Sequence, residues 1–202
     1  MATYIGPKSR KSRRVGAKLF PKDDRIFTKR NFPPGMHLQR RRRLSGFAQQ
    51  LLEKQKAKWM YGIFEKQFRR YYREAMKKSG ETGVVLMQLL ETRLDNVVYR
   101  LGLAQTRPQA RQLVSHGFFN VNGKKVNIPS FALKPGDLVS VIPKKLESKF
   151  FQTQKSILAN YQPPVWLELN IKDFGGKVIA VPQAGDLEQL VNPQLIIEHY
   201  SR

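Results

Sequence analysis

The clearest pattern of hydrophobic and polar positions lies in the middle of the chain, between residues 93 and 117. Four apolar residues recur there at the spacing of one helical face: Leu94, Val97, Val98 and Leu101. Gly102 follows them and can end that helix. A second helix is predicted to begin at Thr106, which forms a capping box with Gln109 and precedes Pro108, and to end at Gly117. The pattern therefore predicts two short helices in succession.

After these helices the apolar spacing changes from helical to strand-like. Residues 118–121 and 124–126 flank Asn122-Gly123, which favours a tight hairpin because both turn positions need a positive φ. Pro135-Gly136-Asp137 predicts another turn, and a strand follows at residues 138–141. The middle of the chain is therefore expected to be a helix-helix-β unit.

Helical and strand-like patterns continue on both sides of this unit. Ser45 is a plausible N-cap for a helical stretch that ends near Lys78 and is interrupted near Gly62. Other segments are predicted as helices at residues 84–92 and 146–162, and as strands at 165–171, 177–181 and 195–200, with a turn at Gly175-Gly176. We expect the late strands to pack back onto the helices of residues 45–92.

Together these elements predict an α+β protein with two lobes. One lobe is a mostly helical body with small C-terminal strands, the other is the inserted helix-helix-β unit, and a basic arm precedes both. The expected boundaries are 1–45 for the arm, 46–91 for the helical body, 92–152 for the inserted unit and 153–202 for the strands that complete the body.

Charge narrows the class of partner. The chain has 202 residues and a net charge of +22, which favours nucleic acid or an anionic membrane. The net charges of residues 1–45, 46–92, 93–145 and 146–202 are +12, +4, +7 and −1. We see no apolar run of transmembrane length and no secretory signal. The last quarter, which is not basic, is therefore expected to face protein rather than RNA.

The predicted helical stretch that begins near Ser45 carries two stripes of side chains, one aromatic and one basic. An aromatic stripe is interpreted as core rather than as a base-stacking platform; it consists of Met60, Phe64, Phe68, Tyr71 and Ala75. The opposite stripe is interpreted as a phosphate-binding face rather than as an ordinary solvated one, because few acidic residues interrupt it; it consists of Lys66, Arg69, Arg70, Arg73 and Lys77.

Four stretches together resemble one known family. The run RLDNVVYRLGLAQTRPQARQLVSHGFF from Arg93 resembles the RNA-binding αL motif found in small-subunit ribosomal protein S-four, tyrosyl-tRNA synthetases and certain pseudouridine synthases. The segments from Leu51 to Tyr72, from Tyr4 to Lys8 and from Ile196 to Ser201 also resemble bacterial S-four. The resemblance covers nearly the whole chain and is specific to the S-four family.

This resemblance implies a cytoplasmic ribosomal protein that binds 16S rRNA at a multi-helix junction and nucleates assembly of the subunit body. It also implies contact with ribosomal protein S-five, at an interface linked to decoding accuracy, and with other small-subunit proteins. Some S-four proteins carry a zinc site built from cysteines, but this chain has no cysteine, so no metal is expected. No cofactor, membrane or small-molecule substrate is expected either.

The candidate RNA-binding residues follow the basic stretches. Arg107 and Arg111 share one helical face and are expected to have no acidic partner in reach. The full set is Arg10, Lys11, Arg13, Arg14, Arg40, Arg41, Arg42, Arg43, Lys54, Lys56, Lys66, Arg69, Arg70, Arg73, Arg93, Arg100, Arg107, Arg111, His116, Asn122, Lys124 and Lys125. Because the arm has few periodic apolar residues, we expect residues 1–45 to be largely disordered until RNA binds.

The sequence contains no recognisable catalytic constellation. Ser115-His116 lacks the surroundings of a nucleophile, and Asp95 is better interpreted as a local charge partner. Two rival functions stay open at this point: an RNA-modifying enzyme that carries the αL motif, and a regulator that acts mainly on messenger RNA. Modification of a transcript would identify the first, and the RNA that co-purifies with the protein would identify the second.

Overall fold

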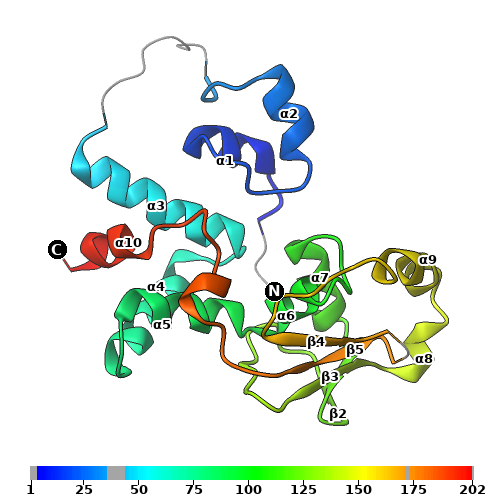
Figure 1. Ribbon diagram of the computed structural model, residues 1–202. Coiled ribbons are helices and arrows are strands. Elements are labelled where there is room, and N and C mark those ends of the chain that lie inside the picture. The colour runs from blue at the N-terminus through cyan, green and yellow to red at the C-terminus, as the bar shows by residue number, and fades with distance from the viewer. Residues whose placement is uncertain (1–3, 36–43, 172, 202) are drawn as a thin grey trace. The chain divides into compact units, whose positions relative to one another are not determined.

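The computed structural model describes residues 4–35, 44–171 and 173–201, which fold into two compact units (Figure 1). Unit 1 combines the described residues up to Leu86 with those from Glu188 onward, and unit 2 runs from Met87 to Leu187. The predicted α+β class is confirmed, since the chain combines helices with one small antiparallel sheet in the described residues. The units differ from the expected domains, because most of the C-terminal quarter belongs with the helix-helix-β unit.

Unit 1 is helical. Its helices are α1 (Lys8–Val15), α2 (Asp23–Lys29), α3 (Gly46–Met60), α4 (Glu65–Lys77), the first half of α5 (Thr82–Glu91) and α10 (Pro193–Tyr200). The Ser45 Oγ caps α3 by accepting a hydrogen bond from the Ala48 N–H at 3.3 Å. The chain then turns at Gly62, whose φ is +64°. The predicted N-cap and the predicted interruption are therefore both confirmed.

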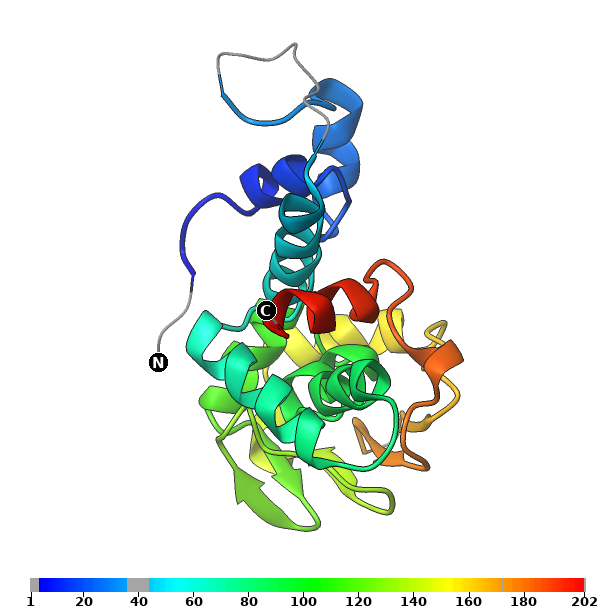
Figure 2. The same cartoon turned by 90° about the vertical axis from the view of Figure 1, so that its left-hand side faces the viewer.

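Residues 195–200 belong to helix α10, so the strand predicted there is wrong. Pro193 occupies the first turn of α10, and the Asn192 side chain accepts a hydrogen bond from the Gln194 N–H at 3.0 Å. This start signal outweighs the β-branched pair that suggested a strand. Figures 1 and 2 both show α10 lying against α3, where Ile196 is fully buried and Tyr200 stacks on Tyr72 at 4.6 Å.

A carboxylate joins these helices of unit 1. Glu65 accepts hydrogen bonds from Lys54 at 2.9 Å, Lys58 at 2.8 Å and the Tyr200 hydroxyl at 2.7 Å. Partial burial raises the pKa of Glu65, but the three hydrogen bonds and the charge of Lys58 outweigh it and lower the pKa to about 2. The ionised carboxylate therefore stabilises the fold above its unfolded pKa, and this contribution is lost as the pH falls towards 2.

The aromatic stripe is only partly buried. Phe68 and Ala75 are fully buried and Met60 nearly so, as expected for core residues. Phe64 is 44% exposed, and Tyr72 is more deeply buried than Tyr71. Phe64 is the N-cap of α4 and has an extended backbone, so it does not share the buried face of the helical residues.

The described part of the N-terminal arm is folded, in contrast to the disorder expected for it. Asp23 is buried, and its carboxylate accepts hydrogen bonds from the backbone N–H groups of Leu19 and Phe20 at 2.9 and 2.8 Å. Ser12 of α1 is also buried, and α1 contacts both α2 and α3. A buried carboxylate that fixes the turn before α2, together with packing against α3, supplies order that apolar periodicity alone does not predict.

Unit 2 is built on a five-stranded antiparallel sheet with the order β2-β1-β3-β5-β4. Its strands are β1 (Phe119–Val121), β2 (Lys124–Val126), β3 (Leu138–Val141), β4 (Leu167–Asn170) and β5 (Gly175–Val178). Its helical elements are the second half of α5, α6 (Leu94–Arg100), α7 (Arg107–Ser115), α8 (Pro143–Leu146), α9 (Lys149–Leu158) and the 3₁₀ turn η1 (Ala184–Asp186). The predicted helix pair, hairpin and strand at residues 138–141 are confirmed.

Strands β4 and β5 extend this sheet, so for them the expectation of packing back onto residues 45–92 is wrong. For residues 195–200 it is confirmed, since α10 packs against α3. Strand β5 pairs with β3, with Val139 opposite Gly176 and Ser140 opposite Gly175. Gly175-Gly176 is therefore not the predicted turn; the chain turns earlier, at Phe174, whose φ is +43°. One apolar core joins this sheet to α6, α7 and α9.

Gly175 and Gly176 of β5 lie in close contact with neighbouring parts of unit 2. A Cβ on Gly175 would lie far inside contact distance of the Val139 carbonyl oxygen. A Cβ on Gly176 would meet the side chain of Leu101 and the carbonyl oxygen of Glu168. The absence of a side chain therefore allows β5 to sit between β3 and β4 beneath α6 residues.

We predict that Gly175→Ala lowers the free energy of unfolding by about 1–3 kcal/mol, because the new methyl group must push β3 away from β5. Thermal and urea unfolding followed by circular dichroism measure this. Gly185→Ala is the matched control, since nothing lies within 4 Å of a Cβ at that position. Equal stability of the two variants would contradict the close approach.

Candidate nucleic-acid interface

Two helices of unit 2 position the cations that sequence analysis placed on the αL motif. Helix α6 buries Leu94, Val97 and Val98 and ends at Gly102, whose φ is +74°. Helix α7 begins at Thr106, whose hydroxyl accepts a hydrogen bond from the Gln109 N–H at 3.3 Å. The predicted capping and stop signals therefore set where each helix starts and where its polar face points.

The first buried ion-pair group forms around Asp95. Arg93 donates from Nε to Asp95 Oδ1 at 3.0 Å and from Nη2 to Oδ2 at 2.7 Å, with both side chains buried. Arg111 of α7 donates from Nη1 to the same Oδ2 at 3.3 Å. The prediction of Arg93 as an RNA-binding residue is therefore corrected to a structural role. The expectation that Arg111 has no acidic partner is wrong.

The second group forms around Glu91, which is fully buried. Arg100 donates to its two carboxylate oxygens at 3.0 and 2.7 Å, and Asn96 donates to it at 2.6 Å. Arg107 in turn donates to the Asn96 Oδ1 at 2.8 Å and lies over the Tyr99 ring at 4.6 Å. Arg100 and Arg107 are partly exposed, so each has a fixed position and still reaches the surface.

The candidate residues of the β1–β2 hairpin have two different roles. Asn122 has a φ of +50°, and its side chain donates to Asp137 at 2.8 Å and accepts from the Leu138 N–H at 2.9 Å. Its amide is therefore used to fix the turn rather than being free for RNA. Lys124 and Lys125, on β2, are exposed. His116, at the end of α7, is exposed as well.

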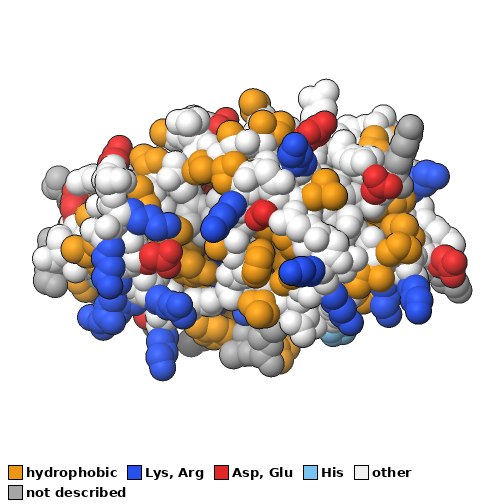
Figure 3. Space-filling view, turned by 90° about the horizontal axis from the view of Figure 1, so that it is seen from below, with side chains coloured by type: hydrophobic (Ala, Val, Ile, Leu, Met, Phe, Trp, Pro, Cys, Tyr) orange, Lys and Arg blue, Asp and Glu red, His pale blue; other side chains and the backbone are white. Residues whose placement is uncertain are grey.

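In unit 1 the predicted basic stripe of α4 is on the surface. All four of its candidate residues are exposed, namely Lys66, Arg69, Arg70 and Arg73. On the face that Figure 3 shows, Lys and Arg side chains extend outward between hydrophobic patches. Helix α4 thus presents cations on one side while Phe68 and Tyr72 are buried on another.

Two candidate lysines of α3 are corrected to structural roles. Lys54 is buried against Glu65. Lys56 is mostly buried and donates to the Glu53 carboxylate and, at 3.0 Å, to the Leu190 carbonyl oxygen. The acidic partners are Glu53, three residues from Lys56, and Glu65, eleven residues from Lys54. A count of basic residues therefore overestimates the number of lysines on α3 that are available to RNA.

The four candidates of α1 divide in the same way. Arg13 donates to the Phe32 carbonyl oxygen at 2.8 Å and lies over the Phe32 ring, so it holds the arm together. Arg10 and Arg14 are exposed, and Lys11 lies between aromatic rings. Candidates Arg40, Arg41, Arg42 and Arg43 lie outside the described residues.

One aromatic residue near these cations was missed. Trp59 lies beside the α1 cations, and no sequence rule singled it out. The sequence does contain a hint: Trp59 directly follows Lys58 and ends a stretch with lysines at 54, 56 and 58. Such mixing of aromatic and basic side chains is typical of nucleic-acid-binding surfaces.

Other kinds of site find no support within the described ranges. There, no group of three or more His, Cys, Asp or Glu residues could hold a metal ion. None of the helices in those ranges is long and apolar enough to cross a membrane.

Comparison with known proteins decides the family. A family model described as the ribosomal protein S4/S9 N-terminal domain matches residues 3–91, and one described as the S4 domain matches residues 92–139. Small ribosomal subunit proteins uS4 of Roseiflexus castenholzii, Chloroflexus aurantiacus and Dictyoglomus turgidum are 50%, 49% and 50% identical to the chain. Each of these alignments covers 100% of both chains. The chain belongs to the uS4 family.

Membership in the uS4 family confirms the resemblance and the expectation of an RNA-binding, non-enzymatic protein. The S4 domain match covers α6, α7, β1, β2 and the start of β3. It includes Asp95 and the residues that donate to Glu91, which lies one residue before the match. The individual RNA-binding residues and the S-five contact stay as proposals.

We predict that Asp95→Asn lowers the free energy of unfolding by about 3–5 kcal/mol, because it leaves the buried Arg93 guanidinium without its carboxylate. Urea unfolding followed by circular dichroism measures this. Arg111→Gln is the comparison variant, and we expect a smaller loss from it because the pair of Arg93 and Asp95 stays intact. Equal losses for the two variants would show that Arg93 does not depend on Asp95.

Proposed function

We propose that this uS4 family member is a structural component of the small subunit of the cytoplasmic ribosome. In this proposal it binds 16S rRNA directly and helps to nucleate assembly of the subunit body. The observation that carries the proposal is the full-length match to uS4 proteins at about half identity. The exposed cations of α1, α4 and β2 supply the chemistry that a phosphate-rich partner requires.

The mechanism is recognition of RNA shape by cations whose positions are fixed. Glu91 and Asp95 hold Arg100, Arg107 and Arg111 in place before RNA arrives, so little side-chain entropy is lost on binding. A-form RNA hides its base edges in a deep groove, and we therefore expect contacts with phosphates and 2′-hydroxyls to dominate. Cations on each unit can bind different RNA helices.

We predict that the double change Arg69→Gln and Arg73→Gln weakens binding to a 16S rRNA transcript. Each lost phosphate contact costs on the order of 1 kcal/mol and lowers the slope of log K against log salt by about one unit. Filter binding at several salt concentrations measures both. The control is Lys155→Gln with Lys177→Gln, which removes two exposed cations from the non-basic last quarter. An equal loss from the control pair would remove α4 from the interface.

We also propose that the last quarter faces a neighbouring protein, with ribosomal protein S-five as the partner. Two of its acidic residues have roles within the chain: Asp186 accepts a hydrogen bond from the Gln183 N–H, and Glu198 accepts one from Gln50. Glu168, on β4, is exposed. A carboxylate in this position would be repelled by RNA phosphates and would suit a basic protein surface.

We predict that Glu168→Gln leaves affinity for the 16S rRNA transcript unchanged and weakens binding to purified S-five severalfold. Glutamine is chosen instead of lysine because Lys177 is the cross-strand neighbour of Glu168, and a lysine at position 168 would place two like charges opposite each other. Filter binding and calorimetry measure the two affinities. A severalfold loss of rRNA affinity without unfolding would place this strand in the RNA interface instead.

A further inference from the structure

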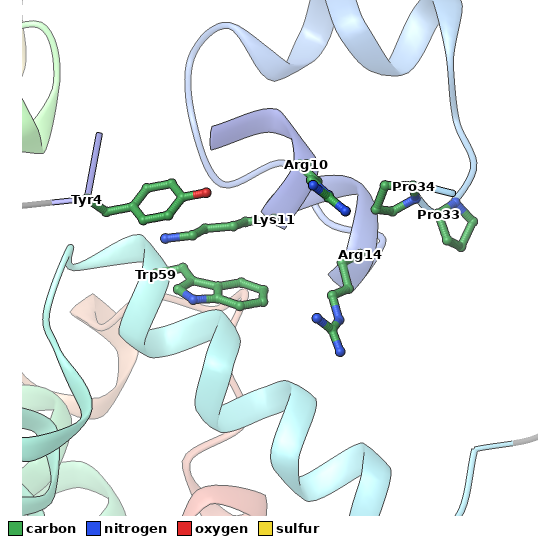
Figure 4. A pocket seen from close by; sticks show the side chains of 7 residues that line it. All are labelled: Tyr4, Arg10, Lys11, Arg14, Pro33, Pro34 and Trp59. Atoms are coloured by element: carbon green, nitrogen blue, oxygen red, sulfur yellow. The ribbon is translucent and has the colours of Figure 1, made fainter. Parts of the chain in front are cut away.

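A pocket with a volume of about 550 Å³ opens in unit 1 between α1 and α3 (Figure 4). Three cations of α1 line one side, namely Arg10, Lys11 and Arg14. Trp59 of α3 and Tyr4 provide aromatic walls, and Pro33-Pro34 closes the far end. The volume falls within the range of roughly 300–1,000 Å³ that small-molecule sites occupy.

Lys11 lies between the two aromatic rings of this pocket. Its Nζ is 3.1 Å from the centroid of the Tyr4 ring and 5.5 Å from that of the Trp59 ring. Burial, followed by the nearby charges of Lys58 and Lys8, lowers the pKa of Lys11 to about 8. The site therefore disfavours additional positive charge, and an anion placed beside Lys11 would relieve that repulsion.

The other two cations of the pocket have no internal role within the described part of the chain. There, neither Arg10 nor Arg14 has a hydrogen-bond or ion-pair partner, and no acidic side chain lines the pocket. Arg13 on the same helix is different, because it binds the Phe32 carbonyl oxygen and the Phe32 ring. Arg10 and Arg14 are four residues apart, a spacing that places them on one face of α1, and both line the pocket (Figure 4).

Trp59 also differs from the second tryptophan of the chain. Trp166 is 2% exposed and belongs to the core of unit 2, whereas Trp59 is only partly buried and lines the pocket. A tryptophan ring beside arginines that lack partners is the combination with which proteins bind unpaired nucleotides: the base stacks on the ring and the phosphate meets the cations.

We propose that this pocket holds one unpaired nucleotide of the bound RNA, with its base stacked on Trp59 and its phosphate held by Arg10 and Arg14. The proposal rests on the proposed function and adds a site of defined chemistry to it. A nucleotide within an RNA helix does not fit, because both faces of its base are already stacked on neighbours.

Tryptophan fluorescence of the full chain tests the proposal without altering the pocket. Titration with a 16S rRNA transcript is expected to quench Trp59 as the base stacks on it. The matched variants are Trp166→Phe, which is expected to keep the quench, and Trp59→Phe, which is expected to lose it. Heparin, a polyanion without bases, is expected to bind in a salt-dependent way and to leave the fluorescence of Trp59 nearly unchanged.

Affinity provides the second measurement. Trp59→Leu is expected to weaken binding to the transcript about tenfold, and Trp59→Phe is expected to restore most of the loss because a ring is again present. The change Arg10→Gln with Arg14→Gln is expected to lower the salt slope. Thermal unfolding of each variant confirms that the fold is intact.

The outcomes separate this inference from the proposed function. Tight binding of the transcript by the unaltered chain without a quench of Trp59, or with an equal quench by heparin, would overturn the nucleotide site alone. Normal affinity of a folded Trp59→Leu variant would do the same. Failure of the unaltered chain to bind the transcript would overturn the proposed function.

Discussion

Two buried carboxylates determine the geometry of the S4 domain in this chain. Removing Glu91 and Asp95 from water is costly. The cost is offset because Arg93 and Arg111 donate to Asp95, and Arg100 and Asn96 donate to Glu91, at hydrogen-bond distance. Those donors come from α6, α7 and the residue before α6, so the ion pairs fix the angle at which the two helices meet. The same pairs hold Arg100, Arg107 and Arg111 partly exposed. Structural stability and the presentation of charge to RNA therefore depend on the same few atoms.

Local signals in the sequence predicted the elements of this domain well. Thr106 with Gln109, Gly102 at a positive φ and Asn122-Gly123 each act within a few residues, so their consequences can be reasoned from spacing alone. The same reasoning failed at residues 195–200, where Ile196 and Ile197 suggested a strand. There the decisive signals, Asn192 and Pro193, precede the apolar run and were not weighed.

Long-range pairing was beyond the sequence argument. Nothing local indicates that Lys54 meets Glu65, that Arg93 is buried, or that Gly175 lies against the Val139 carbonyl oxygen. Each requires knowledge of which segments come together in space. For this reason the candidate cations include buried and paired ones, while Trp59, which lies beside α1 only in the folded chain, was absent from the candidates.

Unit 1 is built from the two ends of the chain, and this has a consequence for how the protein folds during its synthesis. Helix α3 packs against α10, yet the whole of unit 2 lies between them in the chain. A ribosome that makes this chain from its N-terminus releases residues 87–187 before it releases α10. Unit 2 can therefore complete its sheet and core while the surface of α3 and α4 that α10 covers is still exposed. Until the last helix emerges, that surface is available to other partners, chaperones among them.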